Sequence, residues 1–404
     1  MGCEMKVIKK ITALFLIMIL TISTSGFVNK VESVQVSKSQ INDSPISMGV
    51  SAHAYVVMDA NSGEIIMSQD ADKKIYPAST TKLLTAVVAI ENCNLDREIE
   101  VKQAALDKVD VESSIVGLRA GSTYTMEQLL YMLLIVSAGD AAEVIAEEVA
   151  GSSEAFATMM NEKAKKLGLK NTNFMNPTGL DEDNHYSSAY DMALIAIELL
   201  KHDEILEFSS VYEDYLRTDT PNKFWLVNTN KLVRFYDGAD GLKTGFTDNA
   251  GYTMAVTAKR NDMRLIAIVL GEAVSKVRNQ ETTSLLDYGF NLYKVQVIKK
   301  QGDVIKTVDL NKATKNKVDV VLDRDITVLS KKSDTEKSYT EKVNINEVKL
   351  PLKENQVVGN IEIYDQGKQI GSYPLIVKEN VKKKNIFKLF LDNLKDIVVG
   401  NLVF

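Results

Sequence analysis

The first part of the chain combines short strand-like runs with longer segments of helical spacing. Apolar residues 54–58 and 64–67 flank Asn61-Ser62-Gly63, a pattern that predicts a β-hairpin. From Ser79 onward the apolar positions recur at helical spacing. Strands at both ends with helices between them predict an α+β domain over residues 51–292, with a sheet covered by helices. Further helices are predicted over 129–135 (after a capping-box pattern from Thr125 to Gln128), 141–150, 154–167, 188–200 and 278–292, and strands over 252–258 and 265–270.

The pattern changes after residue 293. Short runs of alternating apolar and polar residues follow one another without a helical segment. Asp365-Gln366-Gly367-Lys368 supplies a turn between two of these runs. The runs predict a separate small β domain over residues 293–378. Its strands are expected at 318–320, 326–328, 343–345, 361–363 and 373–377.

The N-terminus has the layout of an export signal. Lysines near the start precede an apolar run over residues 11–22, and small residues follow that run. The run is short for a bilayer span, so a removable signal peptide over residues 1–26 is favoured over a retained anchor. Residues 27–50 are polar and Ser-rich, and we interpret them as a spacer.

The last segment, residues 379–404, has an amphipathic pattern. Phe387, Phe390, Leu391 and Leu394 share one helical face behind a run of three lysines. This pattern predicts a helix that lies in the membrane interface, whereas a helix that packs on a core or dimerises is the alternative. With the export signal, it places the expected protein at the outer face of the cytoplasmic membrane.

Composition narrows the partners and the chemistry. The chain of 404 residues has a formal net charge of −6, which argues against a nucleic-acid partner. Loss of Cys3 with the signal would leave Cys93 alone, so we expect no disulfide and a buried Cys93. The sequence has no metal-ligand spacing and no phosphate-binding loop, and none of its three histidines has a convincing serine–acid pairing. Neither a metal nor a cofactor is expected.

Three short patterns carry candidate chemistry, and the first is Pro77-Ala78-Ser79-Thr80-Thr81-Lys82. Ser79 and Lys82 lie three residues apart, so they would be neighbours on one helical turn. A lysine in a dry site loses its preference for charge, and Lys82 could then take the proton of the Ser79 hydroxyl. Alone, the pattern fits equally a capped helix with a surface lysine.

The other two patterns add polar groups. Ser137-Ala138-Gly139-Asp140 follows an apolar helix and offers a second hydroxyl, although a capping serine is the alternative. Lys243-Thr244-Gly245 lies on a predicted strand. Its cation and hydroxyl suit a substrate carboxylate, and its glycine lets a ligand approach the backbone closely. A β-turn with an exposed lysine is the alternative here.

Together the patterns resemble the Ser-x-x-Lys, Ser-x-Asn and Lys-Thr-Gly set of penicillin-binding proteins and serine β-lactamases. The similarity covers about residues 51–290, and the small β domain and terminal helix fit the same layout. It implies a penicillin-binding transpeptidase/β-lactamase-like catalytic domain, a small all-β domain and a C-terminal amphipathic helix. Further segments are similar to low-molecular-mass D-alanyl-D-alanine carboxypeptidases of peptidase family S11, namely Asn176-Pro177-Thr178-Gly179-Leu180, 185–191, 228–232, Gly251-Tyr252, and Arg278 and Glu281 ahead of 286–290.

The resemblance implies a role for each residue. The protein would remove the terminal D-alanine from peptidoglycan stem peptides ending in D-Ala-D-Ala, through an acyl-enzyme on Ser79. Lys82 would be the base and Ser137 the proton relay, while backbone N–H groups of Ser79 and Phe246 would hold the oxyanion. β-Lactam antibiotics would acylate Ser79 and stall there. Substrate binding would involve Lys243, Thr244, Gly245, Phe246 and Arg278.

One residue departs from the resembled pattern. Gly139 stands where the family has an asparagine, whose amide contacts substrate and lysine. We therefore expect reduced or altered turnover, and a gain from Gly139→Asn. Asp140 should point elsewhere if it starts the next helix. One alternative is a penicillin-fold protein that binds muropeptides with little turnover. A β-lactamase is the other, but no deacylation motif occupies a suitable position.

Overall fold

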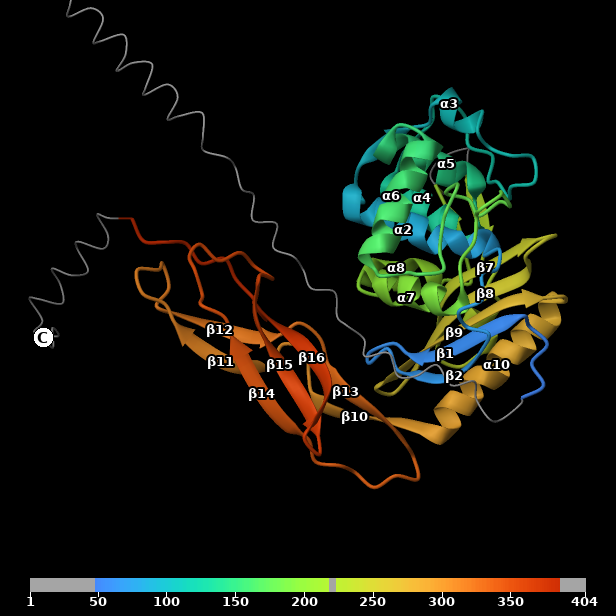
Figure 1. Ribbon diagram of the computed structural model, residues 1–404. Helices are drawn as coiled ribbons and strands as arrows, with labels where there is room; N and C mark the ends of the chain where they lie inside the picture. Colours follow the sequence, from blue (N-terminus) through green and yellow to red (C-terminus); the bar gives the residue numbers. More distant parts are fainter. Residues whose placement is uncertain (1–47, 218–222, 386–404) are drawn as a thin grey trace, which may run out of the picture. The chain divides into compact units, whose positions relative to one another are not determined.

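A computed structural model describes residues 48–217 and 223–385 of the chain (Figure 1). The centre of its N-terminal domain is a five-stranded antiparallel sheet in the order β2-β1-β9-β8-β7. The first strand of the chain therefore lies inside the sheet, paired with β9 from the far end of the domain. The strands are β1 (Ala54–Asp59), β2 (Ile65–Gln69), β7 (Ala239–Thr247), β8 (Gly251–Arg260) and β9 (Met263–Glu272).

Alternating residues of the central strands divide between two hydrophobic cores. Val56 and Ile268 face the larger core with the main group of helices. Val57 and Ala267, their neighbours along the strands, face the smaller core under helix α10 (Ser275–Leu292). Because side chains alternate along a strand, an apolar run is buried on both faces only when both faces are covered. Figure 1 shows α10 against one side of the sheet and the other long helices on the opposite side.

Helices α4 to α7 begin and end within three residues of the predicted bounds, whereas α3, α8 and α9 were not predicted. The capping box is present: Thr125 Oγ1 accepts a hydrogen bond from the Gln128 N–H, and the Gln128 side chain accepts one from the Thr125 N–H. It starts α4 three residues earlier than the apolar pattern suggested, at Met126. The helices are η1 (Ala78–Thr81, a 3₁₀ turn), α2 (Lys82–Asn92), α3 (Gln103–Leu106), α4 (Met126–Ile135), α5 (Gly139–Ala150), α6 (Ser153–Lys166), α7 (Ala189–Leu199), α8 (Asp203–Ser209) and α9 (Leu232–Phe235).

Two small hairpin-like sheets accompany these helices. One pairs β3 with β4, and the other pairs β5 with β6. The sequence analysis predicted neither, because each strand has only three or four residues. The strands are β3 (Glu98–Glu100), β4 (Thr123–Thr125), β5 (Glu213–Leu216) and β6 (Phe224–Val227).

The chain after α10 forms only strands as far as the structure describes it. A five-stranded sheet in the order β11-β12-β16-β15-β14 has its own hydrophobic core, and β10 pairs with β13. All five predicted strands are present, and β10 and β11 were missed. The α+β class with a following all-β domain is thus confirmed. The strands are β10 (Tyr293–Lys299), β11 (Val304–Asp309), β12 (Lys317–Leu322), β13 (Ile326–Lys331), β14 (Thr340–Ile345), β15 (Val357–Asp365) and β16 (Lys368–Val377).

Two predicted segments fall largely outside the described residues. The signal peptide and nearly all of the spacer lie in residues 1–47, and most of the amphipathic helix lies in residues 386–404. The described start of the latter segment is not helical, because Val381 and Lys383 form β-bridges to Leu352 and Ala313. The predicted helix boundary at residue 379 is therefore too early. Within residues 48–217 and 223–385, no helix is long and apolar enough to cross a bilayer.

Candidate active site

Ser79 and Lys82 lie where the sheet meets the main group of helices. Ser79 is in the 3₁₀ turn η1, and Lys82 is the first residue of α2. Lys82 Nζ donates a hydrogen bond of 3.0 Å to Ser79 Oγ and one of 2.6 Å to the backbone oxygen of Thr178. The Lys82 side chain is buried, whereas Ser79 is partly exposed. A candidate nucleophile therefore has a candidate base at hydrogen-bond distance.

Burial changes the protonation of Lys82. Desolvation lowers its pKa from 10.5 to about 7, although the nearby carboxylates of Glu143 and Asp140 oppose this shift. A lysine with this pKa is neutral in a large fraction of molecules at pH 7, and only the neutral amine can accept a proton. The surface-lysine alternative for this pattern is wrong, because Lys82 is 3% exposed.

The segment that holds Lys82 is built around Asn176. Its side-chain oxygen accepts hydrogen bonds from the Thr178 and Gly179 N–H groups and from the Thr178 hydroxyl. Gly179 has a φ of +86°, and a Cβ there would lie 2.0 Å from the Ala78 backbone oxygen. The glycine therefore lets this segment close against η1. The Thr178 carbonyl was missed as a site group, since a backbone acceptor leaves no signal in side-chain chemistry.

Ser137 lies in the short connection between α4 and α5. Its backbone is left-handed, with a φ of +66°, and its side chain is 6% exposed. Left-handed backbone is costly for a residue other than glycine and is concentrated at functional sites. Both α4 and α5 contact α2, the helix that begins with Lys82. Ser137 is thus a buried hydroxyl in a strained turn on the helices that flank Lys82.

Gly139 begins α5, and its missing side chain leaves no empty space. A Cβ placed there would lie 2.8 Å from Ser113 Cβ and 2.9 Å from Ser113 Oγ. The Gly139 N–H also donates a hydrogen bond of 2.6 Å to the Ser114 backbone oxygen. The segment around Ser113 therefore occupies the place that a side chain at position 139 would take.

Asp140, the residue after Gly139, binds the same segment through its side chain. Its buried carboxylate accepts hydrogen bonds from the backbone N–H groups of Val116, Gly117 and Leu118. The expectation that Asp140 points elsewhere is confirmed, since all three of these partners lie in the loop and not at Lys82. We call residues 110–118 the mooring loop, because Gly139 and Asp140 both bind its backbone.

The Lys243-Thr244-Gly245 pattern runs along β7 beside η1. A Cβ at Gly245 would lie 2.8 Å from the Ser79 backbone nitrogen and 2.5 Å from Thr253 Oγ1. Only glycine therefore allows β7 to approach the nucleophile this closely. The Thr244 hydroxyl donates a 2.8 Å hydrogen bond to Thr229 Oγ1. The exposed-turn alternative is wrong for this pattern, because Lys243 is fully buried within the sheet.

Lys243 is a buried basic residue that lies close to both Lys82 and Arg278. Burial, with the positive charges of Lys82 and Arg278, lowers the pKa of Lys243 well below its usual range. Burial also lowers the pKa of Arg278 to about 10, so its guanidinium stays charged at neutral pH. An incoming carboxylate would favour the charged form of Lys243 by opposing these effects. The two residues are candidates for binding an anion near β7.

Phe246 and Tyr252 connect this region to the surface. Their rings have centroids 4.4 Å apart, and the Arg278 guanidinium lies 5.8 Å from the Tyr252 ring centroid. Arg278 also donates a hydrogen bond to the Thr253 backbone oxygen. Phe246 is 49% exposed, so its ring is available at the edge of the site. The structure thus brings Phe246 and Arg278 together through Tyr252, which the sequence analysis named for the family resemblance but not as a site residue.

His185 is buried near the site but does not serve as a base. Its Nε2 lies 3.0 Å from Thr81 Oγ1, and its Nδ1 accepts a hydrogen bond from the Met175 N–H. Burial, followed by the charge of Lys82, lowers the His185 pKa to about 4. Both ring nitrogens have partners, so His185 links η1 to the segment that holds Lys82. No group of three His, Cys, Asp or Glu side chains within the described ranges could hold a metal.

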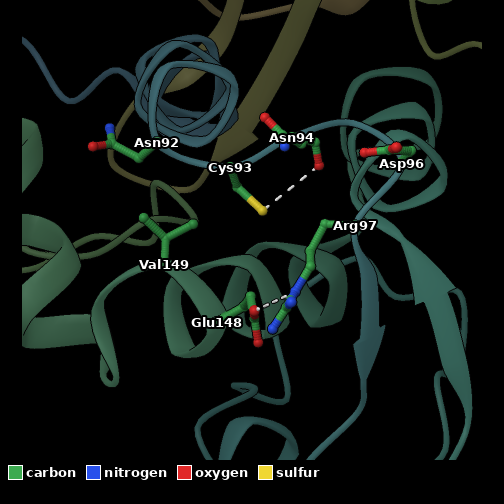
Figure 2. A pocket seen from close by; sticks show the side chains of 7 residues that line it. All are labelled: Asn92, Cys93, Asn94, Asp96, Arg97, Glu148 and Val149. Atoms are coloured by element: carbon green, nitrogen blue, oxygen red, sulfur yellow. Dashed lines mark hydrogen bonds and ion pairs between the residues drawn. The ribbon is translucent and has the colours of Figure 1, made fainter.

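Cys93 lines a pocket at the other end of α2 (Figure 2). The pocket has a volume of about 370 Å³, and an Arg97–Glu148 ion pair lies on its wall. α2 has 11 residues, so this pocket is about 16 Å from Lys82 along the helix. Cys93 is only partly buried, and the expectation of a fully buried cysteine is wrong. The pocket contains none of the three patterns and is separate from the candidate active site.

The fold and the site together define a serine penicillin-binding protein. A family profile described as "D-alanyl-D-alanine carboxypeptidase" matches residues 38–274, and "Penicillin-binding protein 5, C-terminal domain" matches residues 293–383. The chain is 36% identical over 338 residues to D-alanyl-D-alanine carboxypeptidase DacF of Bacillus subtilis, covering 82% of this chain and 86% of the relative. It is 32% identical over 360 residues to DacA of Escherichia coli K12, covering 86% and 87%. The chain belongs to the D-alanyl-D-alanine carboxypeptidase family.

Solved structures agree with this assignment. Penicillin binding protein 5 from Haemophilus influenzae is similar with a TM-score of 0.64 at 29% identity, over 85% of this chain and all of that one. Penicillin-Binding Protein D2 from Listeria monocytogenes, in an ampicillin-bound form, is similar with a TM-score of 0.54 at 32% identity. That match covers 61% of this chain and 99% of the other.

Proposed function

We propose that the protein is a serine D-alanyl-D-alanine carboxypeptidase that shortens peptidoglycan stem peptides. The observation that carries the proposal is the 3.0 Å hydrogen bond between Lys82 Nζ and Ser79 Oγ, made by a buried lysine whose pKa is about 7. Family membership and the names of the relatives support the same reaction.

The first chemical step is attack on the penultimate D-alanine. Neutral Lys82 takes the hydroxyl proton of Ser79, and Ser79 Oγ bonds to the carbonyl carbon. Backbone N–H groups of Ser79 and Phe246 would stabilise the oxyanion, and the close approach of β7 to η1 at Gly245 supports this assignment. The C–N bond then breaks, and Ser137 passes a proton from Lys82 to the leaving amine. Water next attacks the ester and releases the shortened peptide from Ser79.

The terminal carboxylate of the substrate is assigned to the cations beside β7. Lys243 and Arg278 are both buried there, and the Thr244 hydroxyl donates a hydrogen bond to Thr229 Oγ1. Two cations and a hydroxyl match a carboxylate in charge and hydrogen bonding. This arrangement accounts for cleavage at the C-terminal residue, because a peptide without a free terminal carboxylate would leave the cations unpaired.

β-Lactams are proposed to react at the same serine. Their carboxylate would bind the same cations, and their ring carbonyl would acylate Ser79. The ampicillin-bound relative from Listeria monocytogenes supports this assignment. For location, we propose an exported protein held at the outer face of the cytoplasmic membrane by residues 386–404.

The alternative of a muropeptide-binding protein with little turnover gains no support from DacF and DacA, which are both named carboxypeptidases. A β-lactamase is disfavoured by the same relatives. Gly139 affects the rate and not the type of reaction in this proposal.

The test combines labelling and turnover. The purified protein without its signal is treated with a fluorescent penicillin, and D-alanine release is measured from a diacyl-D-Ala-D-Ala peptide. Labelling and release should both disappear in Ser79→Ala and persist in Ser113→Ala as a matched serine control. Labelling that survives Ser79→Ala would exclude Ser79 as the nucleophile. Label without release would favour the binding protein, and rapid loss of label would favour a β-lactamase.

A further inference from the structure

The β5–β6 hairpin presents two aromatic rings to solvent. Tyr215 and Trp225 are directly opposite in the strand register, with ring centroids 6.4 Å apart and planes inclined by 18°. The two residues are 51% and 61% exposed. Trp225 is the only tryptophan in the sequence.

The protein core does not require this pair. Along β6, Leu226 is buried and Phe224 contacts the Tyr124 ring, so both point inward. Trp225 lies between them and therefore points outward. Large apolar groups left exposed together often mark a binding surface. Core packing explains the residues on either side of Trp225, but it leaves Trp225 itself unexplained.

A second aromatic pair extends the same region. Tyr212 precedes β5, and its backbone oxygen accepts a hydrogen bond from the Asn228 N–H just after β6. Its ring contacts Phe235 of α9 edge-on, with centroids 6.1 Å apart, and Phe235 is 71% exposed. We define the hairpin aromatic surface as the stacked pair Tyr215 and Trp225 together with Tyr212 and Phe235 at the base of the hairpin.

Cations border the hairpin aromatic surface. Lys223 Nζ lies 6.0 Å from the Tyr215 ring centroid, and Lys231 and Arg234 lie 5.1 and 4.7 Å from that of Tyr212. Flat aromatic rings stack against the C–H faces of sugar rings, and cations pair with carboxylates. The rings are therefore complementary to the sugar rings of a polysaccharide, and the bordering cations to the carboxylates of its attached stem peptides.

The hairpin also leads directly into the candidate active site. Thr229, two residues after β6, accepts the hydrogen bond from the Thr244 hydroxyl. Thr229 is four residues after Trp225, and four residues of chain span at most about 14 Å. An extended stem peptide of about five residues spans about 17 Å. The sugar end of a stem peptide bound at Ser79 therefore falls within reach of Trp225.

We propose that the hairpin aromatic surface binds the glycan strand of peptidoglycan while an attached stem peptide occupies the site at Ser79. This inference rests on the proposed function, which supplies the substrate. It adds a second binding surface, for the polymer rather than for the peptide, and predicts a preference for polymeric over short substrates.

Trp225 itself reports on binding, because no other tryptophan contributes to the fluorescence. Soluble glycan strands stripped of stem peptides should shift or quench its emission, although they offer nothing to Ser79. Tyr215→Ala should weaken that titration. Anionic phospholipid vesicles are the parallel probe. No change with strands, or a change with vesicles alone, would overturn the proposal, the second outcome in favour of a membrane surface.

Kinetics provide an independent test on two substrates. Trp225→Ala should raise KM for polymeric peptidoglycan about threefold to tenfold, with kcat unchanged. The same variant should keep wild-type turnover of a diacyl-D-Ala-D-Ala peptide and wild-type penicillin labelling, which also show that it is folded. Trp225→Phe should recover most of the loss. Val304→Ala, an exposed apolar position on β11, is the matched control and should have no effect.

The two proposals fail in different ways. If Trp225→Ala has the same KM as wild type for the polymer while the short peptide is still hydrolysed, only the glycan surface is refuted. If the wild-type protein hydrolyses neither substrate, the proposed function is refuted, and the fluorescence titration still reports whether glycan binds.

Discussion

Replacing Gly139 by asparagine tests whether the mooring loop occupies the space beside the catalytic residues. The resemblance alone led us to expect a gain of activity from this change. In the structure, however, the new Cβ would lie 2.8 Å from Ser113 Cβ, well inside ordinary van der Waals contact, and 3.3 Å from the Ser114 backbone oxygen. Ser113 would have to move, although Gly139 and Asp140 hold its loop by backbone hydrogen bonds.

The stability that Gly139→Asn should lose can be estimated as a range. Adding volume to a packed site typically costs about 1–3 kcal/mol. For a domain of this size, that corresponds to a fall in Tm of roughly 2–10 °C. Gly139→Asn alone should therefore lose stability and show no gain in penicillin acylation or D-alanine release. Gly139→Asn combined with Ser113→Gly removes the contact and should recover the stability.

The double variant separates the two effects of the asparagine. Once Ser113 no longer blocks it, the amide can contact substrate, and acylation should rise by up to about 10² relative to Ser113→Gly alone. The assay is the second-order rate of fluorescent penicillin labelling, with thermal melting measured on all variants. An unchanged Tm together with faster acylation in Gly139→Asn alone would show that the loop yields freely, and would refute this reasoning.

Three further predictions follow from the site. Acylation should rise with pH through about 7 and then level off, because only neutral Lys82 accepts the serine proton; a rate already maximal at pH 5 would contradict this assignment. Glu143→Gln should move the pH midpoint of acylation to lower pH, since the Glu143 carboxylate favours charged Lys82. The rate of penicillin labelling across pH measures this midpoint, and an unmoved midpoint would exclude the coupling. Gly245→Ala should slow penicillin labelling by at least about 10², because its Cβ would meet the Ser79 backbone at 2.8 Å; normal labelling would show that β7 can retreat at little cost.

The sequence predicted the groups that act through side chains better than those that act through the backbone. Helical spacing made Ser79 and Lys82 neighbours, the family resemblance selected them, and in the structure Lys82 Nζ lies 3.0 Å from Ser79 Oγ. The Thr178 carbonyl, which holds Lys82, could not be found, because any residue supplies a carbonyl. Ser113 was also missed, since its contact with Gly139 joins segments that are distant in the sequence.

For the fold as well, features with a local sequence signal were predicted, and features that depend on distant contacts were not. Long helices and buried strands followed from apolar periodicity, whereas β5 and β6, with four residues each, are too short to show a period. The order of the central sheet was not predicted either, because periodicity does not say which strands pair. The pairing of β1 with β9 depends on tertiary packing alone.

That pairing also constrains when the domain can fold. Ala54 of β1 is opposite Leu270 of β9, so the sheet lacks its central neighbour until almost the whole domain has been synthesised. Contacts so far apart in sequence form slowly, because a long loop must close before they contribute. Until then, β1 can pair with β2, but its edge toward β9 would have no partner strand. If the chain is exported, as proposed above, this delay keeps it unfolded while it passes through a translocation channel. The enzyme would then become active only after β9 has left the channel on the far side.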